Sequence, residues 1–233
     1  MRTSRALRFR VFVRRQIVPM VVMILVLCSF RSAIADWNIV PTGSMNPTIL
    51  EGDRIFVNKL AYGLRVPFTD MEVAHWSSPR RGEVVVFRSP ADGDRLVKRV
   101  VGVPGDTVQL ANNVLLINGT PASYTLLPGT ALAATLPGTQ LPHTFASESM
   151  PGGMTHIVMA TPRLPAMRNF GPVTIPAGEY FMLGDNRDNS ADSRYFGFVA
   201  EHAIVGRSSH VAYSLDVDHW QMPRWNRTWE TLP

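Results

Sequence analysis

One serine of this sequence stands where it could act as a nucleophile. Ser44 lies in the segment PTGSMNPT at residues 41–48. Gly43 allows a sharp turn that presents both the hydroxyl and the amide of Ser44 to a cleft, and Pro47 fixes the exit from that turn. An alcohol is a poor nucleophile near neutral pH, so a catalytic Ser44 needs a neighbouring base. The alternative interpretation is a solvated turn serine.

The base that the sequence offers is a lysine. Lys59 and Lys98 are the only lysines among 23 basic residues, and an arginine does not give up its proton in a protein. Lys98 lies in an apolar run, where a strand would place Leu96 and Val100 on its own face and Arg99 on the other. Apolar neighbours lower the pKa of a lysine and make the neutral amine accessible. We therefore predict that Lys98 is a general base, with a strand lysine that reaches water as the alternative, and that Lys59 is a surface charge.

A polar loop follows an apolar strand in the C-terminal part of the chain. Residues 184–197, GDNRDNSADSRYFG, are rich in short polar side chains, which predicts a tightly hydrogen-bonded loop. A calcium loop of the EF-hand type that began at Asp185 would need glycine and glutamate where Ser190 and Phe196 stand, so this kind of site is excluded. We predict neither a metal site nor a cofactor.

This loop could instead support Ser44 and Lys98. We expect Ser190 to accept a hydrogen bond that orients the Lys98 amine, and Asp192 and Arg194 to form an ion pair that fixes the loop. A plain solvated turn is the alternative. A histidine-based hydrolase is disfavoured, because no G-x-S-x-G motif occurs and none of the six histidines lies near one of these segments.

The rest of the pattern predicts mainly β structure past residue 36, because short apolar runs alternate with Gly, Pro, Asn and Asp. Asn112–Asn113 indicates a hairpin. Residues 119–178 gather Pro, Gly, Thr, Ala and Met, which predicts an inserted, looser subdomain. Trp220, Trp225 and Trp229 are predicted to pack on the sheet, with contact to a bilayer as the alternative. The predicted strands cover residues 54–57, 84–87, 96–103, 108–110, 114–117, 179–183, 203–205 and 211–213.

The N-terminal segment combines a basic cluster with an apolar run. Six arginines lie in the first fifteen residues and account for the net charge of +5. The rest of the chain has 17 basic and 18 acidic residues, so its charge does not indicate a nucleic-acid surface. Residues 17–30 carry no charge and reach the length of a membrane span only if Arg31 extends toward the headgroups. A retained anchor with a cytoplasmic N-terminus fits this pattern, and so does a cleavable signal peptide that ends at Ala35. Both interpretations export the rest of the chain.

Together, the three polar segments resemble the bacterial type I signal peptidases, membrane-anchored Ser/Lys proteases that remove signal peptides from exported proteins. The resemblance covers residues 36–110 and 179–199, and the block GDNR is its most specific part. It implies a mainly β, signal-peptidase and LexA-like catalytic fold with one N-terminal transmembrane helix. It also implies a basic cytoplasmic N-terminus, an anchor, a first catalytic part, an inserted β subdomain and a second catalytic part, at residues 1–16, 17–35, 36–110, 111–178 and 179–233.

The resemblance also implies roles for individual residues. Ser44 would be the nucleophile and Lys98 the general base, and the Ser44 amide and the Thr42 hydroxyl would form the oxyanion hole. The family prefers small residues at the first and third positions before the cut, which implies two shallow apolar pockets. The residues at the matching positions are Val40, Met45, Ile55, Leu96 and Val97.

Three features depart from the usual pattern of the family. Thr42 replaces a frequent serine and adds a methyl group at the oxyanion site, Phe196 replaces a frequent tryptophan, and one span is predicted where some members have two. The resemblance implies a retained anchor in the bacterial inner membrane, with the catalytic domain on the outer face. The expected partners are preproteins with signal peptides and the lipid bilayer, and no nucleic acid. The alternatives are a LexA-like self-cleaving regulator and a non-enzymatic exported β module.

Overall fold

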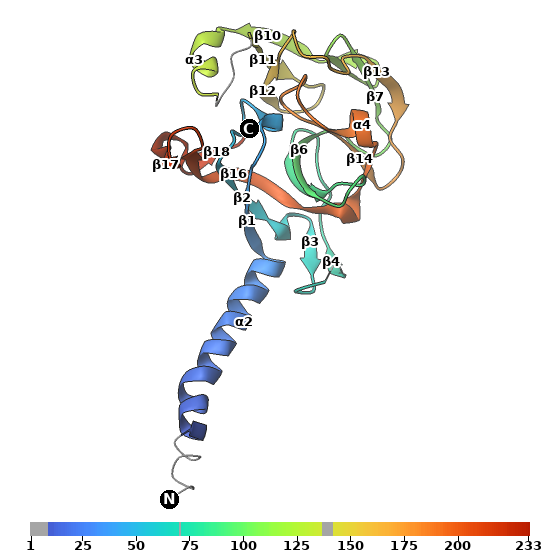
Figure 1. Cartoon of the computed structure of the whole chain (residues 1–233). Helices are drawn as coiled ribbons and strands as arrows, with labels where there is room; N and C mark the ends of the chain where they lie inside the picture. The colour runs from blue at the N-terminus through green and yellow to red at the C-terminus, as the bar shows by residue number, and fades with distance from the viewer. Residues whose placement is uncertain (1–8, 70, 137–141) are drawn as a thin grey trace, which may run out of the picture.

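The structure is a computed structural model that describes residues 9–69, 71–136 and 142–233. Figure 1 shows a long helix, drawn in blue, that leads from the N-terminal end into a β portion. This helix covers Phe9–Ala33, with a π-helical segment η1 at Val13–Ile17 followed by α2 at Val18–Ala33. It is the one helix among the described residues that is long and apolar enough to cross a membrane.

Charged side chains fix the C-terminal end of α2 to the β portion. Lys59 Nζ donates hydrogen bonds to the backbone carbonyls of Arg31 and Ser32, at 2.9 and 3.0 Å. The last carbonyls of a helix lack partners within it, so a cation at this position satisfies them and opposes the negative end of the helix dipole. The prediction that Lys59 is a surface charge is wrong, because its side chain is 12% exposed and caps the helix.

Within the described residues, the largest sheet has nine strands and carries the candidate site. Its path runs β1-β2-β16-β5-β6-β14-β15, and β17 and β18 also pair with β16. The predicted fold class, a mainly β protein with an N-terminal apolar helix, is confirmed. The strands are β1 (Ala35–Ile39), β2 (Asp53–Asn58), β5 (Val84–Arg88), β6 (Arg95–Gly102), β14 (Glu179–Leu183), β15 (Val199–Ala200), β16 (Ile204–Asp216), β17 (Met222–Pro223) and β18 (Glu230–Thr231).

Two smaller sheets lie between β6 and β14 in the sequence, and Figure 1 shows them at the end of the molecule away from α2. The predicted boundary at residue 110 falls inside β7, whose partners β8 and β13 belong to one of these smaller sheets. The first sheet contains β10 (Ser123–Leu127), β11 (Thr144–Ser149) and β12 (Thr155–Ala160); the second contains β13 (Phe170–Thr174), β7 (Thr107–Ala111), β8 (Val114–Ile117) and β9 (Thr120–Pro121).

A separate two-stranded hairpin projects beside the end of α2, as Figure 1 shows. It consists of β3 (Gly63–Arg65) and β4 (Glu72–His75). Short helical segments complete the described chain: η2 (Gly43–Met45), η3 (Lys59–Ala61), α3 (Gly129–Ala133), α4 (Ser193–Phe196), η4 (Glu201–Ala203) and η5 (Trp225–Arg227).

The local sequence explains several of these elements. Asn112 and Asn113 have φ angles of 51° and 65° and connect β7 to β8, because asparagine tolerates the left-handed conformation that such a hairpin turn needs. The two strands predicted at 203–205 and 211–213 are parts of one strand, β16. A Cβ atom on Gly206 would lie 2.5 Å from the Asn58 carbonyl, so glycine permits β2 to approach β16 closely.

Of the three C-terminal tryptophans, only Trp229 packs on the sheet as predicted, against His210 of β16 and Phe56 of β2. Trp220 is 98% exposed and Trp225 is 77% exposed. Trp229 is also largely exposed, although its ring stacks on His210 with 5.5 Å between the ring centroids. The prediction is wrong for Trp220 and Trp225, because they lie in the turn before β17 and in η5, which leave their side chains in solvent.

Candidate active site

Ser44 lies in the turn that joins β1 to β2, within η2. The loop that begins at residue 184 holds this turn in place. The backbone amide of Asn186 donates to the Ser44 carbonyl at 3.2 Å, and its side-chain amide donates to the Gly43 carbonyl at 3.0 Å. A Cβ atom on Gly43 would lie 2.6 Å from Asn46 Nδ2. A larger residue at this position would therefore force the Asn46 side chain to move.

The structure brings Lys98 into contact with Ser44. Lys98 Nζ donates a hydrogen bond to Ser44 Oγ at 2.7 Å and another to the Val97 carbonyl at 3.0 Å. Lys98 lies on β6, opposite Val85 of the neighbouring strand β5. The residue is 2% exposed. Because side chains alternate along a strand, the neighbouring Arg99 points to the other face, as predicted.

Burial is the largest influence on the charge of Lys98. It lowers the pKa of the amine to about 8, while the carboxylates of Asp192 and Asp185 raise the pKa and limit the shift. An amine with this pKa is neutral in a useful fraction of molecules near neutral pH. A neutral amine 2.7 Å from the Ser44 hydroxyl can take its proton. The pair can therefore activate Ser44 as a nucleophile.

Thr42 lies next to the nucleophile on the exposed side of the turn. Its Oγ1 is 3.5 Å from Ser44 Oγ, and its backbone is extended, with φ −135° and ψ 152°. A hydroxyl group can rotate, so Thr42 is able to donate to an oxygen atom that develops negative charge beside Ser44.

Ser190 does not hold Lys98, contrary to the prediction. The Ser190 hydroxyl is buried and has no hydrogen-bond partner among the described residues. It lies against Gly184 instead: a Cβ atom on Gly184 would meet Ser190 Oγ at 2.2 Å and the Ser44 carbonyl at 2.4 Å. The Lys98 amine is positioned by Ser44 and by the Val97 carbonyl. The role of Ser190 in this structure is thus to pack the loop against the nucleophile turn.

Asp192 and Arg194 form the ion pair that the sequence predicted. Arg194 Nε and Nη2 donate to the two carboxylate oxygens of Asp192, each at 2.8 Å, and both side chains are fully buried. Asp192 also accepts from the amide of Gly184 at 3.1 Å. These bonds satisfy the buried charges and fix the loop near Lys98.

A cleft of about 510 Å³ opens beside Ser44 and Lys98. Four of the five predicted pocket residues line it, whereas Met45 does not. Met45 is fully buried and packs with Ile49, because the turn η2 directs its side chain into the core. The lining residues that were not predicted are neighbours of predicted ones in sequence, except Val86, which comes from β5. The residues that line the cleft are Asn38, Ile39, Val40, Pro41, Thr42, Ser44, Ile55, Val86, Asp94, Arg95, Leu96, Val97 and Lys98.

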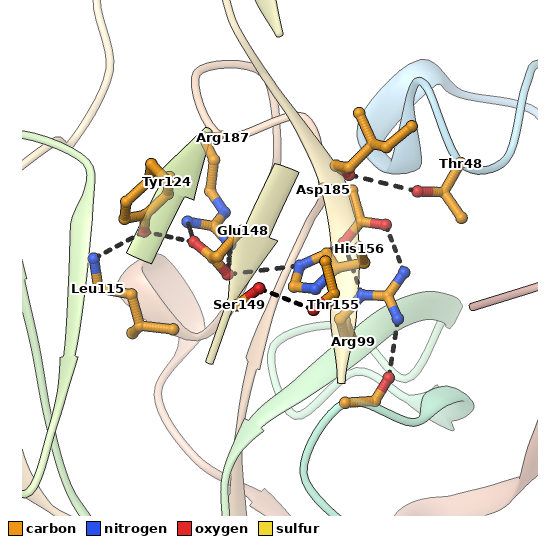
Figure 2. A network of polar contacts seen from close by, with 12 residues as sticks. Thr48, Arg99, Leu115, Tyr124, Glu148, Ser149, Thr155, His156, Asp185 and Arg187 are labelled. Carbon is orange, nitrogen blue, oxygen red and sulfur yellow. Dashed lines mark hydrogen bonds and ion pairs between the residues drawn. The ribbon is translucent and has the colours of Figure 1, made fainter. Parts of the chain in front are cut away.

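Two buried ion pairs join the loop at 184–188 to the strands around it (Figure 2). Arg99 donates to both oxygens of Asp185, at 2.9 and 2.7 Å, and Arg187 donates to both oxygens of Glu148, at 2.7 and 2.6 Å. Tyr124 also donates to Glu148. Because Glu148 lies on β11, these bonds fasten the inserted sheets to the loop that holds the nucleophile turn.

His156 lies between the two ion pairs, as Figure 2 shows. Its Nε2 is 3.4 Å from Glu148 Oε1 and 3.8 Å from Asp185 Oδ1. Burial, followed by the charge of Arg99, lowers the pKa of His156 to about 4 against the opposing effect of the acids. No histidine lies near a motif in sequence. His156 reaches the loop only in the folded chain, because β12 and the loop come together there: the Met159 amide donates to the Asp185 carbonyl at 2.8 Å. Within the parts of the chain that the structure describes, no three His, Cys, Asp or Glu side chains are placed to hold a metal ion.

A serine hydroxyl in contact with a buried lysine amine, beside an open cleft in a mainly β protein, defines the class of Ser/Lys hydrolases. The family model for "Signal peptidase, peptidase S26" matches residues 13–213 of the chain. The chain therefore belongs to this family and is a signal peptidase of the S26 type.

Two relatives from Pseudomonas agree with this assignment. Signal peptidase I of Pseudomonas aeruginosa is 40% identical over 83% of this chain and 69% of that protein, and signal peptidase I of Pseudomonas fluorescens is 39% identical over 88% of this chain and 72% of that protein. A crystal structure of a signal peptidase I from Enterococcus faecalis V583 is 32% identical, covers 56% of this chain and 97% of that chain, and gives a TM-score of 0.34.

Proposed function

We propose that this chain cleaves signal peptides from exported preproteins, with Ser44 as the nucleophile and Lys98 as the general base. The observation that carries the proposal is the 2.7 Å contact between Lys98 Nζ and Ser44 Oγ, made by an amine that is 2% exposed and lies beside an open cleft. Lys59, the other lysine, caps α2 and is not available for this role.

The proposed reaction proceeds in two halves. Neutral Lys98 takes the proton of Ser44 while Oγ attacks the scissile carbonyl carbon, and the resulting ammonium gives that proton to the leaving amine as the peptide bond breaks. Lys98 then takes a proton from a water molecule that attacks the acyl-enzyme ester, and returns it to Ser44 as the new carboxyl group leaves. A positioned base of this kind contributes about 10²–10⁴-fold in rate.

The oxyanion of each tetrahedral intermediate would accept hydrogen bonds from the Ser44 amide and the Thr42 hydroxyl. The 3.5 Å separation between Thr42 Oγ1 and Ser44 Oγ supports this assignment. Removal of one such donor costs about 10²–10³-fold in rate in serine hydrolases.

The cleft supports a preference for small apolar residues before the cut. Val40, Ile55, Leu96 and Val97 line it beside Ser44. Their branched apolar side chains suit small apolar groups of the substrate, as the family resemblance implies. We therefore assign precursors with Ala-x-Ala before the cleavage site as substrates.

We further propose that the helix Phe9–Ala33 is a retained anchor in the inner membrane of a bacterium, with its N-terminal end in the cytoplasm and the β portion on the outer face. The length and apolar character of this helix support the anchor. The six arginines among the first fifteen residues support the orientation, because basic segments stay on the cytoplasmic side.

The decisive experiment incubates the detergent-solubilised full chain with a labelled precursor whose signal peptide ends in Ala-x-Ala. Mass spectrometry of the released fragment should place the cut directly after the second alanine. A precursor with bulky residues at both alanine positions is the matched control and should stay intact. Cleavage of the chain itself with no cleavage of the precursor would instead indicate a self-cleaving regulator, and no cleavage at all would indicate a binding module.

A further inference from the structure

A second pocket, of about 240 Å³, lies where α2 enters the β portion. The final helical residues Ser32 and Ala33 form one side, and Phe68 and Thr69, in the loop of the β3–β4 hairpin, also line it. The backbone amide of Phe68 donates to Ser32 Oγ at 2.7 Å, which holds this loop against the helix end. Four basic side chains complete the lining: Lys59, Arg65, Arg88 and Arg95.

One nearby carboxylate serves several of these cations. Asp36 lies 2.7 Å from Arg31, 3.6 Å from Lys59 and 3.5 Å from Arg95. A single negative charge shared among three positive ones leaves the group positive. Burial lowers the pKa of Lys59, Asp36 raises it, and the charges of Arg95 and Arg31 lower it again.

Arg65 makes no ion pair within the parts of the chain that the structure describes. Both of its hydrogen bonds come from Nη2 and go to backbone carbonyls, those of His202 and Ile204, at 3.0 and 2.9 Å. These neutral acceptors fix the guanidinium without neutralising it. Guanidinium groups arranged in this way match the oxygen atoms of a phosphate group.

The hairpin beside the pocket presents apolar side chains to the outside. Phe68, Met71 and Val73 are 66, 68 and 64% exposed. Figure 1 shows that this hairpin projects on the side of the β portion where α2 leaves it. Exposed apolar side chains at the level of a helix end suit the boundary between lipid headgroups and acyl chains.

We propose that this pocket binds the phosphate of an anionic phospholipid, with the acyl chains lying along Phe68 and the end of α2. The inference rests on the proposed role of the helix Phe9–Ala33 as a membrane anchor. It adds a specific headgroup site to that anchor and would hold the β portion at a fixed height and rotation over the bilayer. Arg65 and Arg95 would contact the phosphate, while Lys59 stays bound to the helix end.

The lipid is favoured over a free phosphate ion by the position of the pocket. A soluble anion would gain nothing from the exposed apolar hairpin or from the adjoining helix. A phospholipid would use the basic lining and the apolar surface together, and each basic residue near an anionic bilayer adds to the binding.

The test measures lipid binding to the full chain in detergent by native mass spectrometry, with phosphatidylglycerol, phosphatidylcholine and inorganic phosphate as separate probes. The test variant is Arg65→Gln with Arg95→Gln, the two arginines assigned to the phosphate, and the matched control is Arg80→Gln with Arg163→Gln, which removes two exposed arginines outside the pocket lining. If the double variant does not fold, Arg65→Gln alone should lose about 5-fold in affinity for phosphatidylglycerol. Arg65→Lys keeps the charge and is the control for that substitution. The readout is independent of proteolysis, so it separates this site from the proposed cleavage activity.

Wild-type protein should bind phosphatidylglycerol at least 10-fold more tightly than phosphatidylcholine. The pocket variant should lose about 30-fold in affinity for phosphatidylglycerol, as expected for two basic side chains near anionic lipid. The control variant and Arg65→Lys should stay within about threefold of wild type. Equal binding of the two lipids, an equal loss in the control variant, or competition by inorganic phosphate with no lipid preference would each overturn the proposal.

Discussion

Arg99 and Asp185 form a bidentate ion pair on the face of β6 that lies opposite Lys98. Two hydrogen bonds of 2.9 and 2.7 Å join them, and both residues are buried. Arg99 directly follows the lysine in β6, and Asn186, which directly follows Asp185, binds the turn that carries Ser44. The pair therefore connects the backbone that positions the amine to the backbone that positions the hydroxyl.

We predict that Lys98→Arg abolishes precursor cleavage and leaves the fold intact. Arginine keeps the positive charge but does not release its proton, so Ser44 loses its base and the rate should fall by at least about 100-fold. Cleavage of a labelled precursor and circular dichroism measure the two effects. Lys59→Arg is the matched control, because arginine can still cap α2, and it should keep most of the activity. Full activity in Lys98→Arg would show that another residue is the base.

The pH dependence of kcat/KM should report the Lys98 amine. Burial lowers its pKa to about 8, and the charged form cannot accept a proton. Activity should therefore be low at pH 6, reach half of its maximum near pH 8 and level off above about pH 9. Roughly a tenth of the free enzyme is active at pH 7 on this basis. Rates on a precursor peptide between pH 6 and 10 give the midpoint. A midpoint near 6.5 would point to a histidine instead.

Replacement of the nucleophile by cysteine should leave weak activity that thiol reagents remove. Cys28 is the one native cysteine and is exposed on α2, so the experiment starts from Cys28→Ser. In that background Ser44→Cys should cleave the precursor slowly and lose the activity after alkylation, whereas Ser44→Ala should not cleave it at all. The Cys28→Ser parent should be insensitive to alkylation. Equal sensitivity of parent and variant would contradict the assignment.

Gly184→Ala should displace the nucleophile turn. The added Cβ atom would lie 2.4 Å from the Ser44 carbonyl and 2.2 Å from Ser190 Oγ, so the loop and the turn must separate. A shift of this kind costs about 100-fold in rate and about 1–3 kcal/mol in stability. Precursor cleavage and thermal unfolding measure both.

Gly129→Ala is the control for that substitution, because its Cβ atom would meet nothing closer than the side chain of Phe145, at 3.3 Å. The control should keep wild-type activity. Wild-type rates in Gly184→Ala would show that the close packing of the loop against the turn has no part in catalysis.

Features set by neighbours in sequence could be predicted from the residues alone. The contact between Ser44 and Lys98 joins distant segments, and it is the family resemblance that implied it. The apolar run around Lys98 predicted a strand with a buried amine and with Arg99 on the other face, and both are present. The pair Asn112–Asn113 predicted its hairpin, because left-handed turns select asparagine. The ion pair of Asp192 with Arg194 is likewise a contact within one loop.

The errors concern features that depend on distant segments. Met45 was assigned to the cleft, but the rotation of the turn η2 buries it. Lys59 has a polar neighbour in sequence, and its burial comes from the end of α2, a separate element. His156 reaches the motif loop through β12, and the sequence pattern carries no signal for that pairing.

The last prediction concerns stability in acid and follows from His156. Its pKa is lowered from 6.5 to about 4 in the folded chain, chiefly by burial, so the unfolded chain takes up a proton at a higher pH than the folded chain does. The contribution of neutral His156 to the stability of the folded chain is therefore complete above pH 6.5. As the pH falls toward 4 this contribution is lost, and the free energy of unfolding falls by about 3 kcal/mol in all. The buried ion pair of Glu148 with Arg187 loses its charge only at lower pH, because the pKa of Glu148 is below its ordinary value of 4.5. Thermal unfolding of the detergent-solubilised chain between pH 7 and pH 4.5 covers the range in which histidines change charge. His143, whose pKa is also lowered by burial, contributes there too, so the His156 variant is needed to separate the two. His156→Gln should flatten this dependence, whereas His219→Gln, whose side chain is 74% exposed, should follow wild type. If wild type and His156→Gln lost the same Tm over that interval, the neutral buried histidine would not be the source of the acid sensitivity.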